Sequence, residues 1–280
     1  CQRIASSLHP DVYLVTVEPG GKEVRISQIR ELEHWLYLKP YEGRMRVAII
    51  DPADAMNIEA QNAFLKTLEE PPEQAVLILV ACHEGRLLPT VRSRCQRVAL
   101  APVPIPLLAS ALAQMGVREG ELFARLAQGR PGLALTLAYE PDLWARWQEE
   151  AQRAASLPHM SIRDRLQLAQ ALASAEAGQG SPKGLLWALD VWERWWEDVL
   201  LVQGGALHLA AHLHLLPQLE ASAQIPSQEV QAFLWAIMRT RQYLESNVNA
   251  RLALEILLLE APQVPSDNSK GALAVEAGAC

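Results

Sequence analysis

The chain has 280 residues, of which 50% are hydrophobic and 20% are charged, and its formal net charge is −7. This balance argues against a broad basic surface that grips nucleic acid directly, and the lack of any apolar run of about eighteen residues argues against a membrane span. The four widely spaced cysteines form no disulfide pattern, which is typical of a cytoplasmic protein. The sequence begins with Cys1 and a short polar stretch that does not fit a signal peptide, so we expect a fragment of a longer chain.

The first hundred residues alternate patterns typical of strands and helices. Strands are predicted at Val12–Val17, Val47–Ile50 and Ala75–Ala81, and the last two are wholly apolar, as in strands covered on both faces. Helices are predicted from a cap at Ser27 to Leu38 and from a cap at Asn57 to Pro71-Pro72. The residues expected on their apolar faces are Ile29, Leu32 and Leu36 in the first, and Ala60, Phe64, Leu65 and Leu68 in the second. Alternation at this spacing predicts an α/β domain with a parallel sheet.

Beyond Pro102 the strand patterns disappear, and the rest of the chain is predicted to be all-α. The expected helices are Leu107–Met115, Glu119–Gln128, Leu133–Tyr139, Leu185–Val202, Glu229–Ser246 and Ala250–Glu260, with breaks at Gly116, Gly129 and Pro131-Gly132. The tail from Pro262 to Cys280 has no apolar period and is expected to be disordered.

Two groups of side chains in the helical part carry alternative interpretations. Trp192, Trp195 and Trp196 share one helical face with Leu185, Leu189 and Val199, and Trp187 lies nearby. Core packing is the favoured reading of this cluster over a subunit contact, and the final-helix residues Leu254, Leu257 and Leu258 carry the same ambiguity. His208 and His212 have a spacing that can hold a metal, but no third ligand is in register, so solvated or interfacial histidines are expected.

The segment Thr90–Gln96 holds the strongest candidate for chemistry. Arg94 lies between Ser93 and Cys95, just before a predicted short strand, Val98–Leu100. A guanidinium keeps its charge at any working pH and offers a planar fork of donors to a phosphate. Arg94 therefore has the character of an arginine that stabilises a transferring phosphoryl group in trans, on a neighbouring subunit.

The remaining parts of an ATPase are weak in this sequence. Gly20-Gly21-Lys22 lacks the earlier glycine of a phosphate loop and has Glu23 where a hydroxyl should follow the lysine, which favours a plain turn. Asp51 ends an apolar strand, where a magnesium ligand would lie, but Pro52 follows it and has no group to orient an attacking water. A turn or cap role is the favoured reading of Asp51.

Several motifs taken together resemble the clamp-loader subunits of bacterial DNA polymerase III, within the AAA+ superfamily, and their delta-prime branch in particular. The residues that carry the resemblance are His9–Val12, Ile49–Asn57, Ala63–Pro72, Leu88–Gln96 and Asn247–Glu255. The gamma/tau motor subunits share some of these motifs. Pro52 and Gly132 depart from the motor pattern, which resembles an acidic residue after the aspartate and an arginine that senses nucleotide. Both departures favour delta-prime.

The resemblance implies a fold and a division into domains. The implied fold is a partial AAA+ parallel-sheet core at 1–101, whose phosphate-loop region is expected upstream of Cys1. A small three-helix lid domain at 102–158, a helical collar or oligomerisation domain at 159–261 and the disordered tail at 262–280 follow. Full-length members carry a four-cysteine zinc module, of which Cys1 resembles the last ligand. One cysteine cannot build such a site, and Cys82 and Cys95 are expected to be small buried residues.

The resemblance also implies a function. The expected role is a non-hydrolysing stator subunit of the clamp loader, which presents Arg94 to ATP bound by the neighbouring motor subunit while Ser93 and Cys95 position it. No bound cofactor and no intrinsic ATPase activity are expected of this chain, which would act as part of the polymerase holoenzyme. Implied partners are the gamma/tau and delta subunits, the sliding clamp indirectly, and primer-template DNA through the assembly. The alternatives are a gamma/tau-type ATPase motor, or a helical scaffold with a relict AAA+ core.

Overall fold

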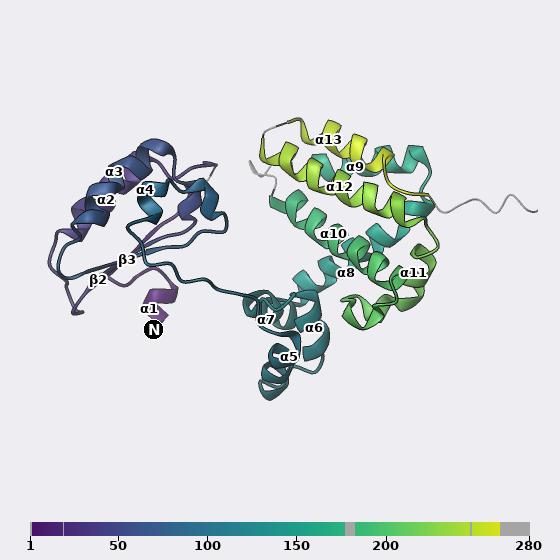
Figure 1. The fold of residues 1–280 in the computed structure, drawn as a ribbon, viewed down its shortest axis with the longest axis horizontal. Coiled ribbons are helices and arrows are strands. Elements are labelled where there is room, and N and C mark those ends of the chain that lie inside the picture. Colours follow the sequence, from purple (N-terminus) through teal and green to yellow (C-terminus); the bar gives the residue numbers. More distant parts are fainter. Residues whose placement is uncertain (1, 19, 177–182, 247, 264–280) are drawn as a thin grey trace, which may run out of the picture. The chain divides into compact units, whose positions relative to one another are not determined.

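The computed structural model describes residues 2–18, 20–176, 183–246 and 248–263, and these form two compact units, 1–100 and 101–280 (Figure 1). The first unit is α/β and the second is all-α, so the predicted fold class is confirmed. Cys1 and most of the tail, with Cys280, lie outside the described residues. The subdivision of the helical part into lid and collar stays a prediction. No helix in the described ranges is both long and apolar enough to cross a membrane.

The first unit is built on a three-stranded parallel sheet in the order β1-β2-β3. The strands are β1 (Val12–Val15), β2 (Arg46–Ile50) and β3 (Ala75–Leu79), with Leu14 opposite Ile49 and Ile49 opposite Ile78. The helices are α1 (Gln2–Ala5), α2 (Ile26–Leu36), α3 (Ile58–Glu69) and α4 (Pro89–Arg92). Short 3-10 turns lie at Ala53–Ala55 and Glu84–Arg86.

The two long helices of this unit form where the sequence predicts them, and α2 and α3 pack against each other (Figure 1). Ile29, Leu32 and Leu36 of α2 are buried, which confirms its predicted face. Asn57 caps α3 by accepting a 2.8 Å hydrogen bond from the backbone N–H of Ala60. The predicted cap at Ser27 is wrong. Arg25 precedes the first turn of α2 instead, and its N–H donates to the Gln28 side chain at 3.0 Å.

The predicted burial of the strands is only partly correct. β2 alternates buried and half-buried side chains, and Val76 and Ile78 of β3 are exposed. The prediction of a third apolar strand at Val98–Leu100 is wrong, since Val98 is 75% and Leu100 93% exposed in an irregular segment. An apolar run forms a strand only where a sheet edge accepts its backbone, and among the described residues this run pairs with none.

A buried carboxylate fixes the loop before β2. Asp11 is 1% exposed and accepts hydrogen bonds of 2.6 to 2.8 Å from the backbone N–H groups of Tyr41, Glu42 and Gly43. Burial pushes the pKa of Asp11 up, but the three backbone donors and the Arg46 charge outweigh it and hold that pKa at about 2. The carboxylate therefore stays charged and ties the loop to the start of β1.

The second unit consists of helices around one hydrophobic core. The helices are α5 (Ile105–Gln114), α6 (Gly120–Leu126), α7 (Pro131–Tyr139), α8 (Pro141–Ser156), α9 (Ile162–Glu176), α10 (Lys183–Gln203), α11 (Leu216–Ser222), α12 (Ser227–Glu245) and α13 (Ala250–Leu259). Three 3-10 turns lie at Leu157–His159, Leu207–Leu209 and Leu213–Leu215. All six predicted helices are confirmed. Pro131 and Gly132 begin α7 rather than break a helix, since proline is accepted in a first turn.

The tryptophan face of α10 is the centre of this core, so the core interpretation is confirmed. Trp192, Trp195 and Trp196 are each 0% exposed, and the ring of Trp196 meets that of Phe233 on α12 edge to face at 5.3 Å. Leu254, Leu257 and Leu258 of α13 are also buried in the same cluster. Aromatic residues of this size bury about 150–250 Å² each, which makes α10 the main source of hydrophobic stabilisation here.

Candidate functional site

A short, firmly anchored segment carries the candidate site in the first unit. α4 begins at Pro89, and its Val91 side chain is fully buried. Gln61, a buried residue of α3, ties the chain before α4 to α3. Its side chain accepts a 2.7 Å hydrogen bond from the Leu88 N–H and donates to the Met56 carbonyl at 3.0 Å. The residues after α4 are therefore held at a fixed place beside the end of α3.

Arg94 follows α4 and turns its guanidinium toward the last residue of α3. Nε donates to Glu69 Oε1 at 2.8 Å, and Nη2 donates to the same oxygen. On the other side Nη1 donates to the Thr90 carbonyl at 2.9 Å. The Arg94 side chain is 33% exposed, so the group is fixed by its own unit and still reaches solvent.

The two predicted positioning residues lie differently. Ser93 Oγ donates to the Thr90 carbonyl at 3.1 Å and lies 3.4 Å from Arg94 Nη1, so it belongs to the same set of contacts. Cys95 is half-buried, its backbone N–H donates to the Arg92 carbonyl at 3.2 Å, and burial raises the pKa of its thiol. No side-chain contact joins Cys95 to Arg94 among the residues that the structure describes. Cys82 is exposed, so its predicted burial is wrong.

Each of the cations of this segment faces a carboxylate. Glu84 lies 3.8 Å from Arg92 and 3.1 Å from Arg97, while Glu69 pairs with Arg94. These side chains are all at least a third exposed, and pairs of this kind contribute about 0–1 kcal/mol of stability. An incoming phosphate therefore meets cations that weak surface pairs neutralise.

The two weaker candidates of the first unit are turn residues, as predicted. Gly20 has a φ of +78°, and the N–H of Gly21 donates to the Glu18 carbonyl at 2.8 Å, which closes a tight turn. Asp51 is exposed in the turn after β2, and its backbone N–H donates to the Val15 carbonyl at 3.0 Å. Gly132, the third residue that the motif comparison singles out, lies in the first turn of α7 in the second unit.

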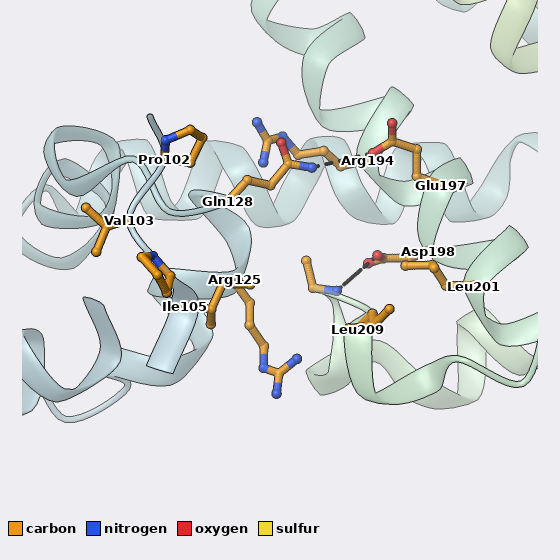
Figure 2. A pocket seen from close by; sticks show the side chains of 12 residues that line it. Pro102, Val103, Ile105, Arg125, Gln128, Arg194, Glu197, Asp198, Leu201 and Leu209 are labelled. Carbon is orange, nitrogen blue, oxygen red and sulfur yellow. Dashed lines mark hydrogen bonds between the residues drawn. The ribbon is translucent and has the colours of Figure 1, made fainter. Parts of the chain in front are cut away.

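The second unit contains a pocket of roughly 330 Å³ that the sequence did not predict (Figure 2). The segment from Pro102 to Ile105, helix α6, helix α10 and the chain around Leu209 line it. Its arginines bind backbone: Arg125 Nη1 donates to the His208 carbonyl at 2.6 Å, and Arg194 Nη1 donates to the Leu126 carbonyl at 2.5 Å. These contacts make the pocket a structural joint between α6, α10 and the loop after α10.

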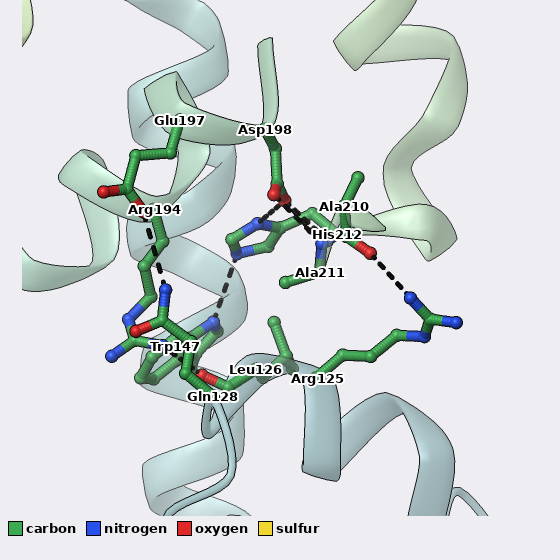
Figure 3. A network of polar contacts seen from close by, with 10 residues as sticks. All are labelled: Arg125, Leu126, Gln128, Trp147, Arg194, Glu197, Asp198, Ala210, Ala211 and His212. Atoms are coloured by element: carbon green, nitrogen blue, oxygen red, sulfur yellow. Dashed lines mark hydrogen bonds and ion pairs between the residues drawn. The ribbon is translucent and has the colours of Figure 1, made fainter. Parts of the chain in front are cut away.

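A buried polar network continues from this joint (Figure 3). Asp198 of α10 accepts from the His212 ring Nδ1 at 2.8 Å and from the backbone N–H of His212 at 2.8 Å. Trp147 of α8 donates from its indole N–H to His212 Nε2 at 3.4 Å. His212 is 0% exposed, so the expectation of a solvated or interfacial histidine is wrong for it.

The predicted metal ligands do not come together in the described part of the chain. His208 lies in a 3-10 turn and His212 lies beyond it, so the two do not share one helical face. Both ring nitrogens of His212 have protein partners. Within the described ranges no group of three or more histidine, cysteine or acidic side chains is placed to hold a metal.

Comparisons with known proteins agree with the motif resemblance. Residues 1–104 match the protein-family model described as DNA polymerase III, delta subunit. The chain is 37% identical over 135 residues to DNA polymerase III subunit delta' of Pseudomonas aeruginosa, a match that covers 48% of this chain and 38% of that protein. It is 35% identical over 147 residues to the delta' subunit of Escherichia coli, covering 51% of this chain and 44% of the relative.

A weaker similarity extends over nearly the whole chain. The tau subunit of Escherichia coli is 25% identical over 298 residues, which covers 95% of this chain and 44% of tau. A solved structure of a DNA polymerase III gamma subunit-related protein from Thermotoga maritima matches with 22% identity and a TM-score of 0.48, over 92% of this chain and 86% of that one.

The chain spans less than half the length of these curated relatives. The strongest identity falls on the unit that holds Arg94, and it is to delta' subunits. Residues 1–104 of this chain therefore belong to the family of the DNA polymerase III clamp-loader delta' subunit.

Proposed function

We propose that this chain acts as a non-hydrolysing stator of a DNA polymerase III clamp loader and presents Arg94 in trans to ATP on the neighbouring motor subunit. The observation that carries the proposal is the placement of Arg94. Its guanidinium lies at the surface of a unit that belongs to the delta' family, and it is anchored through buried Val91 and Gln61. A charge fixed at such a place can stabilise a phosphoryl group outside its own domain without reorganising.

The proposal that the chain does not hydrolyse ATP itself rests on the region after β2. Asp51 is followed by Pro52, which offers no side chain to orient an attacking water, and the Gly20-Gly21 segment is a tight turn. Nucleotide is therefore proposed to bind to the motor neighbour. Zinc remains a proposal for the full-length protein, because Cys1 lies outside the described residues.

The proposed partners are the gamma/tau and delta subunits, with the sliding clamp and primer-template DNA reached through the assembly. Apolar side chains at the surface of the last two long helices support a contact with other subunits. Trp235 and Met238 of α12 are exposed, as are Leu252, Ile256 and Leu259 of α13, and the two helices pack together. Exposed apolar side chains at helical spacing are a feature of protein–protein interfaces.

The runner-up is a gamma/tau-type ATPase, which the match to tau over 95% of the chain supports. The two candidates differ in the activity of the purified chain. A stator is expected to show no ATP turnover, whereas a motor should show turnover that Asp51→Ala abolishes. The third candidate, a helical scaffold with a relict core, would make Arg94 an ordinary surface residue.

The test is a clamp loader reconstituted with the full-length subunit. Arg94→Ala should lower DNA-stimulated ATP hydrolysis while the subunits still co-elute. An arginine supplied in trans can be worth about 10³–10⁵ in rate at its own site, but total turnover should fall by a smaller factor because other sites continue. Arg94→Lys should restore little, since an ammonium lacks the planar fork. Unchanged turnover and clamp loading in the alanine variant would favour the scaffold.

A further inference from the structure

The guanidinium of Arg94 is held on two of its edges and open on the third. It has five N–H groups. The Nε–H and one Nη2–H point to Glu69 Oε1, and one Nη1–H points to the Thr90 carbonyl. One N–H on each terminal nitrogen remains, with Ser93 Oγ at 3.4 Å from Nη1. These two form the outer edge, the fork that binds two oxygens of a phosphate.

We infer that Glu69 is the positioning residue for Arg94, which with the Thr90 carbonyl fixes the guanidinium so that this outer edge faces a phosphate of the neighbouring subunit. The inference rests on the proposed function, since it concerns how the trans arginine is aimed. Arg94 has a long side chain with many rotamers, and a contact on its inner edge removes much of that freedom before the phosphate arrives.

The place of Glu69 makes it suited to this role. It is the last residue of α3, and Pro71-Pro72 prevent the helix from continuing past it. α3 itself is fixed by the fully buried Phe64 and by Thr67, whose Oγ1 donates to Glu33 Oε1 at 2.6 Å. The carboxylate therefore hangs from a rigid element rather than from a loop.

Helix electrostatics argue that Glu69 is not there to stabilise α3. A carboxylate at the C-terminal end of a helix faces the negative end of the helix dipole, which disfavours it. Glu70 lies next to it with the same charge, so each raises the cost of the other. The Arg94 charge offsets this, and the pair is the contact that Glu69 makes among the described residues.

The experiment uses the reconstituted clamp loader in which only the motor subunit beside Arg94 keeps a working phosphate loop. Glu69→Gln keeps the shape of the side chain and removes its charge, and Glu70→Gln is the matched control one residue away. Glu69→Gln should lower the single-turnover rate of ATP hydrolysis by about tenfold, since misplacing a reacting group can cost up to about 10². The KM for ATP should not change, and Glu70→Gln should behave as wild type.

Comparison with Arg94→Ala separates the inference from the proposed function. If both act through one guanidinium, Arg94→Ala should cost more than Glu69→Gln, and the double variant should equal Arg94→Ala. A normal or faster Glu69→Gln beside a slow Arg94→Ala would overturn the positioning role alone, and a faster one would mean that Glu69 sequesters Arg94. A normal Arg94→Ala would remove the proposed function and the inference with it.

A second measurement needs only the isolated full chain. The Nε–H of Arg94 should give a slowly exchanging nuclear magnetic resonance signal in the wild type, because it donates to a carboxylate. Glu69→Gln should speed that exchange, while Glu70→Gln should leave it unchanged. Equal exchange in the wild type and Glu69→Gln would contradict the contact on which the inference depends.

Discussion

Asp198 and His212 form a buried pair in which one carboxylate oxygen accepts from both the backbone N–H and the ring Nδ1 of the same histidine, each at 2.8 Å (Figure 3). The N–H of Ala211 also donates to this carboxylate, at 3.0 Å from each oxygen. A single side chain of α10 thus satisfies three donors of the loop at 211–212. The loop conformation at the joint with α6 depends on this carboxylate.

The first prediction is that Asp198→Ala destabilises the second unit by about 3–5 kcal/mol, because it leaves buried donors without an acceptor. Asp190, on the same helix, pairs with Arg241 and is about half exposed, so Asp190→Ala should cost no more than about 1 kcal/mol. Urea unfolding of both variants measures the two losses. Equal losses would show that the Asp198 contacts carry no special weight.

The second prediction concerns acid pH and His214. Burial lowers the pKa of His214 to about 4 from its usual 6.5, and the neighbouring His212 ring at 6.0 Å acts in the same direction. Between these values the unfolded chain binds a proton that the folded chain does not, so this residue makes stability rise with pH from about 4 to 6.5. The His214 side chain is partly in contact with solvent, so the effect should be small.

The measurement is the free energy of unfolding in urea at pH 5 and pH 7. The wild type should lose more stability at pH 5 than His214→Gln, since glutamine does not titrate. His208→Gln is the control, because it removes a nearby histidine from the other 3-10 turn. If His214→Gln and the wild type change by the same amount, the low pKa is not a feature of the folded chain.

The helices and strands followed from the sequence because their signals are local. The apolar periods of α2, α3, α10, α12 and α13 placed each of them within a few residues. α8 was missed, because Pro141 reads as a break although it begins the helix. Local signals do not include what a segment packs against. Val76 and Val98 were therefore predicted to be buried and are exposed.

The candidate site was partly predictable for the same reason. Arg94 and the run that contains Glu69 stood out separately as motifs, but they are 25 residues apart and only the fold joins them. The Asp198–His212 pair is 14 residues apart and crosses a turn, so helical spacing favoured His208 as the partner of His212 instead. Contacts of this kind depend on tertiary packing, which composition and periodicity do not encode.

The third prediction compares two buried tryptophans of α10. Trp192 donates from its indole N–H to Glu150 Oε2 at 3.0 Å, whereas the indole nitrogen of Trp196 is buried with no hydrogen-bond partner among the described residues. Replacing either with phenylalanine removes similar volume, but only Trp192→Phe takes a hydrogen bond from a buried carboxylate. Trp192→Phe should therefore cost about 1–2 kcal/mol more than Trp196→Phe.

Chemical unfolding of the two variants, followed by circular dichroism at 222 nm, checks this difference. The two substitutions are on one helix face and one residue type, so each is the control for the other. A larger loss for Trp196→Phe would mean that the edge-to-face contact with Phe233 outweighs the hydrogen bond of Trp192.

The last prediction concerns the exposed apolar face of α12 and α13. Trp235 is 68% exposed, so its indole adds little to the folded chain on its own. Buried tryptophans at interfaces often carry 2 kcal/mol or more of binding free energy. Trp235→Ser should therefore weaken binding to partner subunits by about tenfold or more, while the thermal midpoint of the isolated chain changes by only a few degrees. Gln231→Ser, an exposed polar position one turn earlier on α12, should affect neither quantity.

Binding is measured by co-elution with the motor subunit and by titration calorimetry on the full-length protein. Loss of binding with an unchanged midpoint would place the partner contact on α12. If Trp235→Ser binds as tightly as the wild type and Leu252→Ser and Ile256→Ser do too, this face does not contact the motor subunit. The affinity would then have to come from other surfaces, and the proposed role of the last helices in assembly would be wrong.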